Sequence, residues 1–246
     1  MNLYNKILNN SEYLDTVKKI ENIKFITNGK WDWEHGLGHY KRVAEYVNKI
    51  LLQLNCDERT IDLGMSAALL HDIGLSKGSK INHAIESSLM FGKFIDKNDI
   101  TQDEEEILRQ AISDHSKGNN IQSLVGLSLL LADKLDVTYH RTENSSIQDE
   151  MNREIKKIRN VDIQITENNL EVIYTTQGEF DVNILLKNWS KAITVPYKVA
   201  NYLNKKYIFI INNKEIDVAE FLTWIFQLRF VHVFKEKSAK IFVWRN

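Results

Sequence analysis

The chain has 246 residues, enough for one large domain or for one domain with a smaller appendage. Hydrophobic residues make up 43% and charged residues 26%, an ordinary globular balance, and the formal net charge of −1 excludes an overall attraction to nucleic acid or anionic membranes. The single cysteine, Cys56, excludes an internal disulfide and a cysteine-rich zinc site.

The N-terminal segment, MNLYNKILNN, lacks the apolar core of a signal peptide. The longest apolar run, LVGLSLLLA at 124–132, is too short to cross a bilayer, which takes about 20 residues. We therefore expect a cytoplasmic protein with no membrane partner and no bulk binding to nucleic acid. A homodimer is the assembly that the sequence leaves open.

The N-terminal part, residues 1 to about 140, is predicted to be helical because its apolar residues recur at helical spacing. Asn82 and Thr101 each precede such a segment and are predicted helix N-caps. The segment at 121–137 is apolar nearly all round, so it should be the central buried helix. The predicted helices from residue 37 onward are 37–54, 58–71, 82–95, 101–115 and 121–137.

After a polar stretch at 140–150 the pattern changes. A connecting helix is predicted at 147–160, and alternating apolar and polar residues around ENN predict a β-hairpin at 161–176. Helical periodicity then returns in two segments, the second with Pro196 in a first-turn position. The later predicted elements are helices at 181–193 and 196–206 and strands at 207–212, 229–236 and 239–246.

The predicted fold class is therefore mainly α, with a helical bundle followed by a small C-terminal α+β unit. We place the helical domain at residues 1–145. Residues 146–246 then form the connecting helix and the α+β unit, whose role the sequence does not indicate.

The stretch LLHDIGL at 69–75 places an imidazole and a carboxylate side by side at the end of an apolar run. One interpretation is structural: Asp72 satisfies a buried His71, and Gly74 caps the helix. The other is chemical, because histidine and aspartate are metal ligands and acid–base groups. The pair alone does not decide between the two, so the rest of the chain has to.

Further histidines and an aspartate fall near the ends of the predicted helices. Asp133 lies within LLLADKLDV, where a charge without a partner would be costly. Two or more imidazoles around a divalent cation would supply that partner, and imidazole with carboxylate suits manganese, iron, cobalt or zinc. The candidate ligands in the helical part are His39, His71, Asp72, His83, His115 and Asp133.

Three motifs carry a resemblance to a known family. HYKRVAEYV at 39–47, ALLHDIG at 68–74 and LLLADKLDV at 129–137 resemble, in order and spacing, the motifs of the HD-domain metal-dependent phosphohydrolases. The resemblance covers roughly residues 35–141, so the predicted bundle would be an HD domain that holds the metal. It does not extend to the C-terminal unit.

The resemblance implies that His39, His71, Asp72 and Asp133 bind one metal ion. Some members of the family hold a second ion through two histidines located between the last two motifs, where this chain has His83 and His115. We therefore expect one or two divalent transition metal ions per chain. The alternative for His83 and His115 is phosphate contact or proton delivery to the leaving group. His35 is expected beside the ligands or at the surface.

The resemblance also implies hydrolysis of a phosphoester by metal-activated water. Asp72 would help to accept the proton, and Lys134 and Arg42 would assist catalysis by neutralising phosphate charge. Two alternatives stay open: Lys134 points to solvent, and Arg42 pairs with a carboxylate. The other candidates for substrate binding are Lys77, Lys80, Lys117 and Arg141.

Trp31 and Trp33 precede His39 and would either stack on a nucleobase or fill the edge of the core. The expected partner is a small phosphorylated substrate, nucleotide-like or a cyclic nucleotide. The alternative to an enzyme is a metal-binding HD module that serves as a sensor or interaction scaffold. HDIGLSKGS lacks the acidic pair expected for guanosine tetraphosphate hydrolysis, and a di-iron oxygenase of the same fold stays open.

Overall fold

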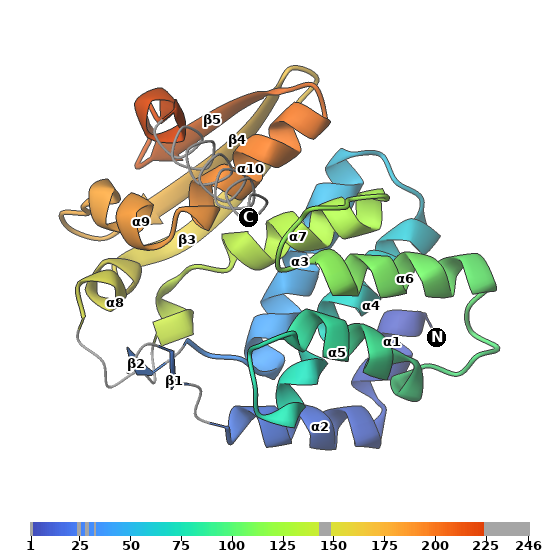
Figure 1. Ribbon diagram of the computed structural model, residues 1–246. Coiled ribbons are helices and arrows are strands. Elements are labelled where there is room, and N and C mark those ends of the chain that lie inside the picture. Colours follow the sequence, from blue (N-terminus) through green and yellow to red (C-terminus); the bar gives the residue numbers. More distant parts are fainter. Residues whose placement is uncertain (1, 24–25, 28–29, 32, 143–148, 224–246) are drawn as a thin grey trace, which may run out of the picture.

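The computed structural model describes residues 2–23, 26–27, 30–31, 33–142 and 149–223. The two strands predicted within 229–246 lie outside these residues. The helices of the N-terminal part form a bundle, and the C-terminal unit lies beside it (Figure 1). The fold class predicted from the sequence, mainly α with a small α+β unit, is confirmed for the described residues.

The bundle contains the helices that the periodicity predicts, together with two short helices near the N-terminus. Short 3₁₀ segments follow several of them, and a two-stranded ribbon, which the sequence did not predict, precedes α3. The α-helices are α1 (Leu3–Leu8), α2 (Ser11–Glu21), α3 (Leu37–Gln53), α4 (Glu58–Leu70), α5 (His83–Met90), α6 (Gln102–Asp114) and α7 (Leu124–Leu135). The other elements are β1 (Ile26–Thr27), β2 (Lys30–Trp31), η1 (Ile73–Lys77), η2 (Phe91–Phe94) and η3 (Tyr139–Thr142).

Local capping fixes where several helices begin. Thr101 forms a capping box with Glu104 at the start of α6. The Thr101 hydroxyl accepts from the Glu104 amide, and the Glu104 carboxylate accepts from the Thr101 amide. Asn82 also precedes a helix, as predicted, but its side chain makes no capping hydrogen bond. The reason is its left-handed backbone, φ 61°, whereas an N-cap side chain reaches the first turn from an extended backbone.

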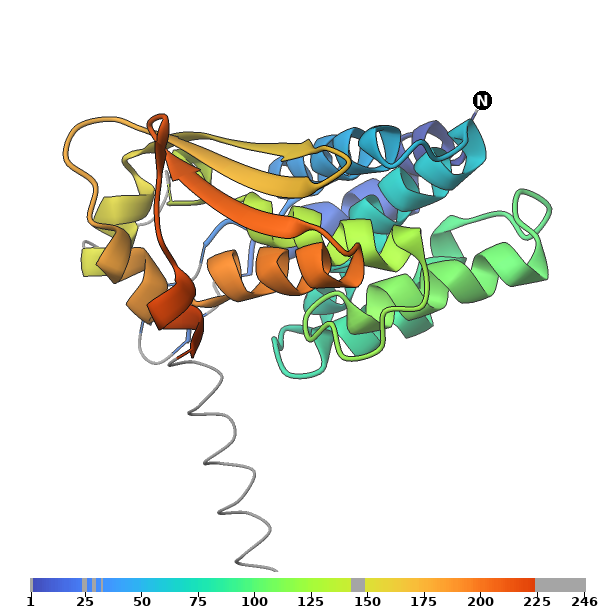
Figure 2. The same cartoon turned by 90° about the horizontal axis from the view of Figure 1, so that it is seen from above.

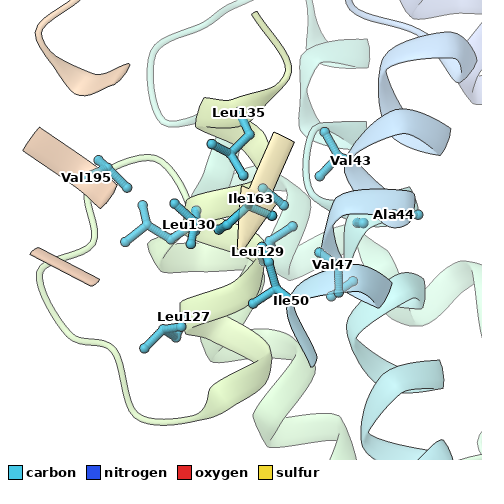
Figure 3. Close-up of a cluster of buried hydrophobic side chains, with 14 of the residues drawn as sticks. Val43, Ala44, Val47, Ile50, Leu127, Leu129, Leu130, Leu135, Ile163 and Val195 are labelled. Atoms are coloured by element: carbon cyan, nitrogen blue, oxygen red, sulfur yellow. The ribbon is translucent and has the colours of Figure 1, made fainter. Parts of the chain in front are cut away.

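Helix α7 is the centre of the core, as its apolar sequence predicts. Leu127, Leu129 and Leu131 are fully buried, and α7 packs against α3, α4, α6 and α10. Figure 3 shows Leu129 and Leu130 of α7 in one cluster with Val47 of α3. The same cluster contains residues of the C-terminal unit, so the hydrophobic core is continuous through both parts of the chain.

The C-terminal unit is a four-stranded sheet with helices around it. Its strands follow the order β3-β4-β5-β6, with the predicted hairpin β3–β4 antiparallel, β4–β5 parallel and β5–β6 antiparallel. The parallel pair needs a crossover, which α9 and α10 provide. The elements are α8 (Glu150–Ile155), β3 (Ile158–Ile165), β4 (Asn169–Thr176), α9 (Val182–Asn188), α10 (Lys191–Tyr202), β5 (Lys206–Ile211) and β6 (Lys214–Glu215).

Two predictions for this unit need correction. The connecting helix is short, Glu150–Ile155, because the chain from Ile158 onward already pairs with β4. Pro196 was expected in a first turn, but α10 begins at Lys191 and contains Pro196 in its interior. There the missing amide hydrogen removes one hydrogen bond of the helix, whereas the neighbouring Val195 and Val199 are buried in the core.

The sheet is joined to the bundle by packing and by hydrogen bonds. Tyr46 of α3 donates its hydroxyl to the Val161 carbonyl of β3 at 2.7 Å, and Gln53 accepts from the Ile165 amide at 2.7 Å. Helix α10 packs against both β5 and α7 (Figure 2). The contact between the two parts of the chain is therefore extensive. The predicted domain boundary at residue 145 stays a prediction. Among the described helices, none is both long and apolar enough to span a membrane.

Candidate metal centre

The ends of separate helices bring the candidate ligands together. His39 is the third residue of α3 and Asp133 lies in the last turn of α7. His71 and His115 directly follow α4 and α6, and His83 is the first residue of α5. Because these helices pack against one another within one bundle, side chains at their ends meet at one place. His39, His71 and His115 are almost completely buried there.

Three of the histidines are oriented in the same way. The Nδ1 atom donates to the backbone carbonyl three residues earlier, at 2.7 Å in His71, 2.8 Å in His83 and 2.7 Å in His115. A carbonyl can only accept, so in the neutral ring this contact assigns the proton to Nδ1 and leaves a lone pair on Nε2. Such outer contacts orient histidines that bind metals.

His39 is oriented by a carboxylate instead. Its Nδ1 lies 2.6 Å from Oδ2 of Asp136, and Arg42 donates from Nε to the other oxygen of Asp136 at 2.8 Å. Arg141 contacts the His39 ring and lies 3.3 Å from Asp136. Burial would raise the pKa of Asp136, but the contacts with His39, Arg141 and Arg42 hold it well below its usual range. Asp136 is thus a fixed anion behind His39.

The first group of candidate ligands consists of His39, His71 and Asp133. The Nε2 atoms of His39 and His71 lie 3.4 and 3.8 Å from Oδ1 of Asp133. One ligand atom from each residue lies within 4.8 Å of the other two. This is the arrangement that a single ion could draw together, since metal–ligand bonds are about 2.0–2.2 Å long.

A second group of candidate ligands shares His71 with the first. His71, Asp72 and His115 again place their ligand atoms within 4.8 Å of one another. The two oxygens of Asp72 face different histidines. Oδ2 lies 3.5 Å from Nε2 of His71 and 3.1 Å from Nδ1 of His35, whereas Oδ1 lies 3.2 Å from Nε2 of His83 and 3.3 Å from Nε2 of His115. Asp72 therefore joins two sets of nitrogen donors.

The chemistry of this donor set fits a divalent transition metal. His71 Nε2 is buried and makes no hydrogen bond to any described residue. Burial lowers the pKa of His71 to about 3, so the ring is neutral at ordinary pH and the Nε2 lone pair can bind a metal ion. The pKa of Asp133 is well below its usual range, because Lys134 and the histidines outweigh the effect of burial. Imidazole nitrogens and ionised carboxylates are the ligands expected for manganese, iron, cobalt or zinc.

A cavity of about 410 Å³ lies over the cluster. Asp72, His83, His115 and Asp133 line it, whereas His39 and His71 lie in the protein interior. The remaining lining residues are mainly cations and aromatic or polar side chains, and some of them come from the C-terminal unit. They are Trp33, His35, Leu75, Lys80, Ser116, Lys134, Arg141, Asn188, Trp189, Ser190 and Lys191.

Three of the predicted cations line this cavity. Lys134 pairs with Asp133, so the solvent-facing alternative for Lys134 is wrong; its side chain is buried. Burial, with Arg141 and Lys134 nearby, lowers the pKa of Lys80 to about 8. Arg141 is buried between the cavity and Asp136. The cavity thus carries positive charge next to the candidate metal ligands.

The other predicted cations are placed elsewhere. Arg42 binds Asp136 and Glu34, the pairing that the sequence left open as its structural alternative. Lys77 is exposed at the end of η1, and Lys117 lines a neighbouring depression. Arg42, Lys77 and Lys117 are not among the described residues that line the cavity. Their assignment to catalysis or substrate binding stays a prediction.

The sequence did not point to several residues of the site. Asp136 lies one helical turn after Asp133, a spacing that could have indicated it. Trp33 stacks on Trp189, with ring centroids 3.8 Å apart, and donates its Nε1 to Asn152 at 2.9 Å, which matches the edge-of-core alternative. Trp189 and Lys191 lie more than fifty residues beyond the last motif, and no local pattern marks them.

Comparison with known proteins identifies one segment of the chain. A family model described as the HD domain matches residues 36–138. The crystal structure of a predicted HD superfamily hydrolase from an uncultured Thermotogales bacterium aligns with 58% of this chain and 83% of that chain, at 21% identity and a TM-score of 0.38. No curated protein matches the sequence significantly. The matched segment, residues 36–138, contains all the candidate ligands from His39 to Asp133, so this part of the chain is similar to HD domains.

Proposed function

We propose that this protein is a metal-dependent phosphohydrolase that acts on a phosphoester of a nucleotide-like or cyclic-nucleotide substrate. The HD domain and the histidine–aspartate cluster support the broader class, a metal-dependent hydrolase. The observation that carries the narrower proposal is the cavity, which Lys80, Lys134 and Arg141 line together with Asp72, His83, His115 and Asp133 of the cluster. Such cations neutralise the charge of a phosphoryl group.

The residues that would hold the metal form two sets, which Asp72 joins. His39, His71 and Asp133 with Asp72 would bind one ion, and Asp72 with His115 and His83 would bind a second. A divalent ion in such a site supplies Lewis acidity and lowers the pKa of bound water to about 7. The orientation of Asp72 toward both sets supports two ions, and a single ion is the alternative.

The chain's own residues would then bind and orient the phosphate. Lys80 and Arg141 place positive charge at the cavity, while Lys134 fixes the Asp133 carboxylate. In the single-ion alternative, His83 is the proton donor to the leaving group. Burial lowers the pKa of His83, but hydrogen bonding and attraction to Asp72 raise it overall, so its Nε2 holds a proton more readily than a free imidazole.

The competing function is a metal-binding HD module without catalysis. In that case the cluster would be structural and the C-terminal unit would bind a partner. The cavity favours the enzyme, because a purely structural metal site is closed by its ligands. Cytoplasmic location and the identity of the substrate stay predictions.

The test is metal analysis of protein purified without chelator, followed by hydrolysis assays. The protein, reconstituted separately with manganese, iron, cobalt and zinc, is assayed on nucleotides, cyclic nucleotides and cyclic dinucleotides. We expect Asp72→Ala to lose metal and to lower the rate on the order of a thousandfold or more, about 4 kcal/mol, while circular dichroism stays unchanged. The matched control is Asp15→Ala, at an exposed position of α2. Wild-type protein that hydrolyses none of these compounds with any metal would disprove the enzyme.

A further inference from the structure

The C-terminal unit provides part of the cavity wall. The junction between α9 and α10, residues 188–191, lines the same cavity as Asp72, His115 and Asp133. These four residues are the end of α9, the connection and the first residue of α10. The candidate metal ligands all come from the bundle, so the cavity is formed between two parts of the chain.

Contacts on both sides fix the position of this junction. Lys191 donates from Nζ to the carbonyl of Ser116 at 3.0 Å, and Ser116 directly follows His115. Trp189 stacks on Trp33 with an angle of 3° between the rings. Trp33 is itself held by its hydrogen bond to Asn152. The junction is therefore tied to the bundle at the edge of the candidate metal centre.

The helix that begins at the junction is also held firmly. Ala192 and Ile193 in the first turn of α10 are completely buried, and α10 packs on α7, which carries Asp133. Figure 3 shows Val195 of α10 near Leu130 of α7. Because interiors are closely packed, the distance between the junction and Asp133 is set by this contact.

The side chains of the junction add to the chemistry of the cavity residues from the bundle. Lys191 is exposed and brings a further ammonium group, whose three N–H donors include the one used by Ser116. Trp189 brings a flat apolar ring with a polar tip, the kind of side chain that binds organic groups in small-molecule sites. A cavity of about 410 Å³ is within the usual range for small molecules.

We propose that Trp189 and Lys191 are substrate-binding residues, with Lys191 contacting the phosphate and Trp189 contacting the organic group that carries it. The substrate is a small organic phosphate held between the two parts of the chain. This proposal rests on the proposed function and extends it, because it assigns the C-terminal unit to the catalytic site and not to a separate sensor.

The experiment compares Lys191→Met and Trp189→Ala with wild type in the full chain loaded with manganese. Binding of inorganic phosphate and of adenosine monophosphate is measured by calorimetry, and kcat and KM are measured for p-nitrophenyl phosphate and adenosine monophosphate. The control is Lys187→Met, an exposed lysine of α9 that is not among the described cavity residues. Manganese content and melting temperature are measured for every variant.

We expect Lys191→Met to weaken phosphate binding about tenfold and to raise KM similarly, with kcat within about threefold of wild type. Trp189→Ala is expected to raise KM for adenosine monophosphate more than the dissociation constant of inorganic phosphate. Manganese content should stay unchanged, and Lys187→Met should behave as wild type. Lys191→Arg should recover phosphate binding, because it restores the charge.

Two failures can be distinguished. If the protein hydrolyses phosphoesters but Lys191→Met binds phosphate as wild type does, the inference is wrong and the proposed function stands. If neither wild type nor any variant hydrolyses these compounds but Lys191→Met still loses phosphate binding, the proposed function is wrong and the assignment of Lys191 to phosphate binding stands. Loss of manganese or a large fall in melting temperature in Lys191→Met that Lys191→Arg also shows would assign Lys191 a structural role and overturn the inference.

Discussion

The Nδ1 atom of His39 lies 2.6 Å from Oδ2 of Asp136, and both side chains are buried. Arg42 and Arg141 hold the same carboxylate from other directions. The contact fixes the His39 ring so that Nε2 faces Asp133, which makes Asp136 a positioning residue for a candidate ligand.

Asp136→Asn should therefore weaken manganese binding, because an amide replaces the anion that orients and polarises the His39 ring. We expect a loss of affinity of about 10–100-fold, measured by calorimetry. Asp162→Asn, which changes a partly exposed aspartate paired with Lys49, is the control and should have no effect. Unchanged affinity in Asp136→Asn would show that His39 does not depend on this contact for metal binding.

The position of Asp72 between two sets of histidines predicts two metal ions per chain. Wild-type protein analysed by mass spectrometry of its metals should approach two manganese ions. His115→Ala should lower that number toward one, since His115 belongs only to the second group. A wild-type value of one, unchanged in His115→Ala, would establish a mononuclear site.

Gly74, directly after the His71–Asp72 pair and Ile73, is required by close packing. A Cβ atom at this position would lie 2.3 Å from the His83 carbonyl oxygen and 2.6 Å from the Ser87 amide nitrogen. Gly74→Ala should therefore displace the start of α5, with a loss of roughly 1–3 kcal/mol in the free energy of unfolding measured in urea. Gly92→Ala, where the added Cβ meets no described atom within 4 Å, is the control. Equal stability of the two variants would contradict this assignment.

The pair formed by Glu104 and Arg59 predicts a pH dependence of stability. Hydrogen bonds from Arg59 are the first cause that lowers the pKa of Glu104, to about 2. A carboxyl group with a lowered pKa stabilises the fold above its unfolded pKa of about 4.3, and this contribution is lost as pH falls toward 2. Glu104→Gln keeps a side chain suited to the capping box but loses the charge.

Glu104→Gln should accordingly be less stable than wild type at pH 7 by less than about 1 kcal/mol, because the side chain of the partner Arg59 is 42% exposed and water screens the pair. The difference should shrink as pH falls from about 4.3 toward 2, followed by urea unfolding at each pH. A difference that does not vary with pH would mean that the charge of Glu104 contributes nothing.

The sequence by itself determined most of the bundle. Helices α3, α4, α6 and α7 begin and end close to the predicted residues, because apolar periodicity and capping side chains such as Thr101 act within a few residues of the chain. The resemblance carried by ALLHDIG and its companion motifs is confirmed by the family match over residues 36–138. The candidate ligands were also chosen from sequence, and their roles await the experiments above.

Only the tertiary structure decided what surrounds those ligands. The pairing of His39 with Asp136, the parallel pairing of β4 with β5 and the position of Lys191 beside Ser116 join residues far apart in the chain. No local pattern encodes such contacts, because they depend on how whole helices and the sheet pack. The cavity and the part that the C-terminal unit plays in it follow from that packing, since the burial of α7 between the bundle and α10 sets their relative position.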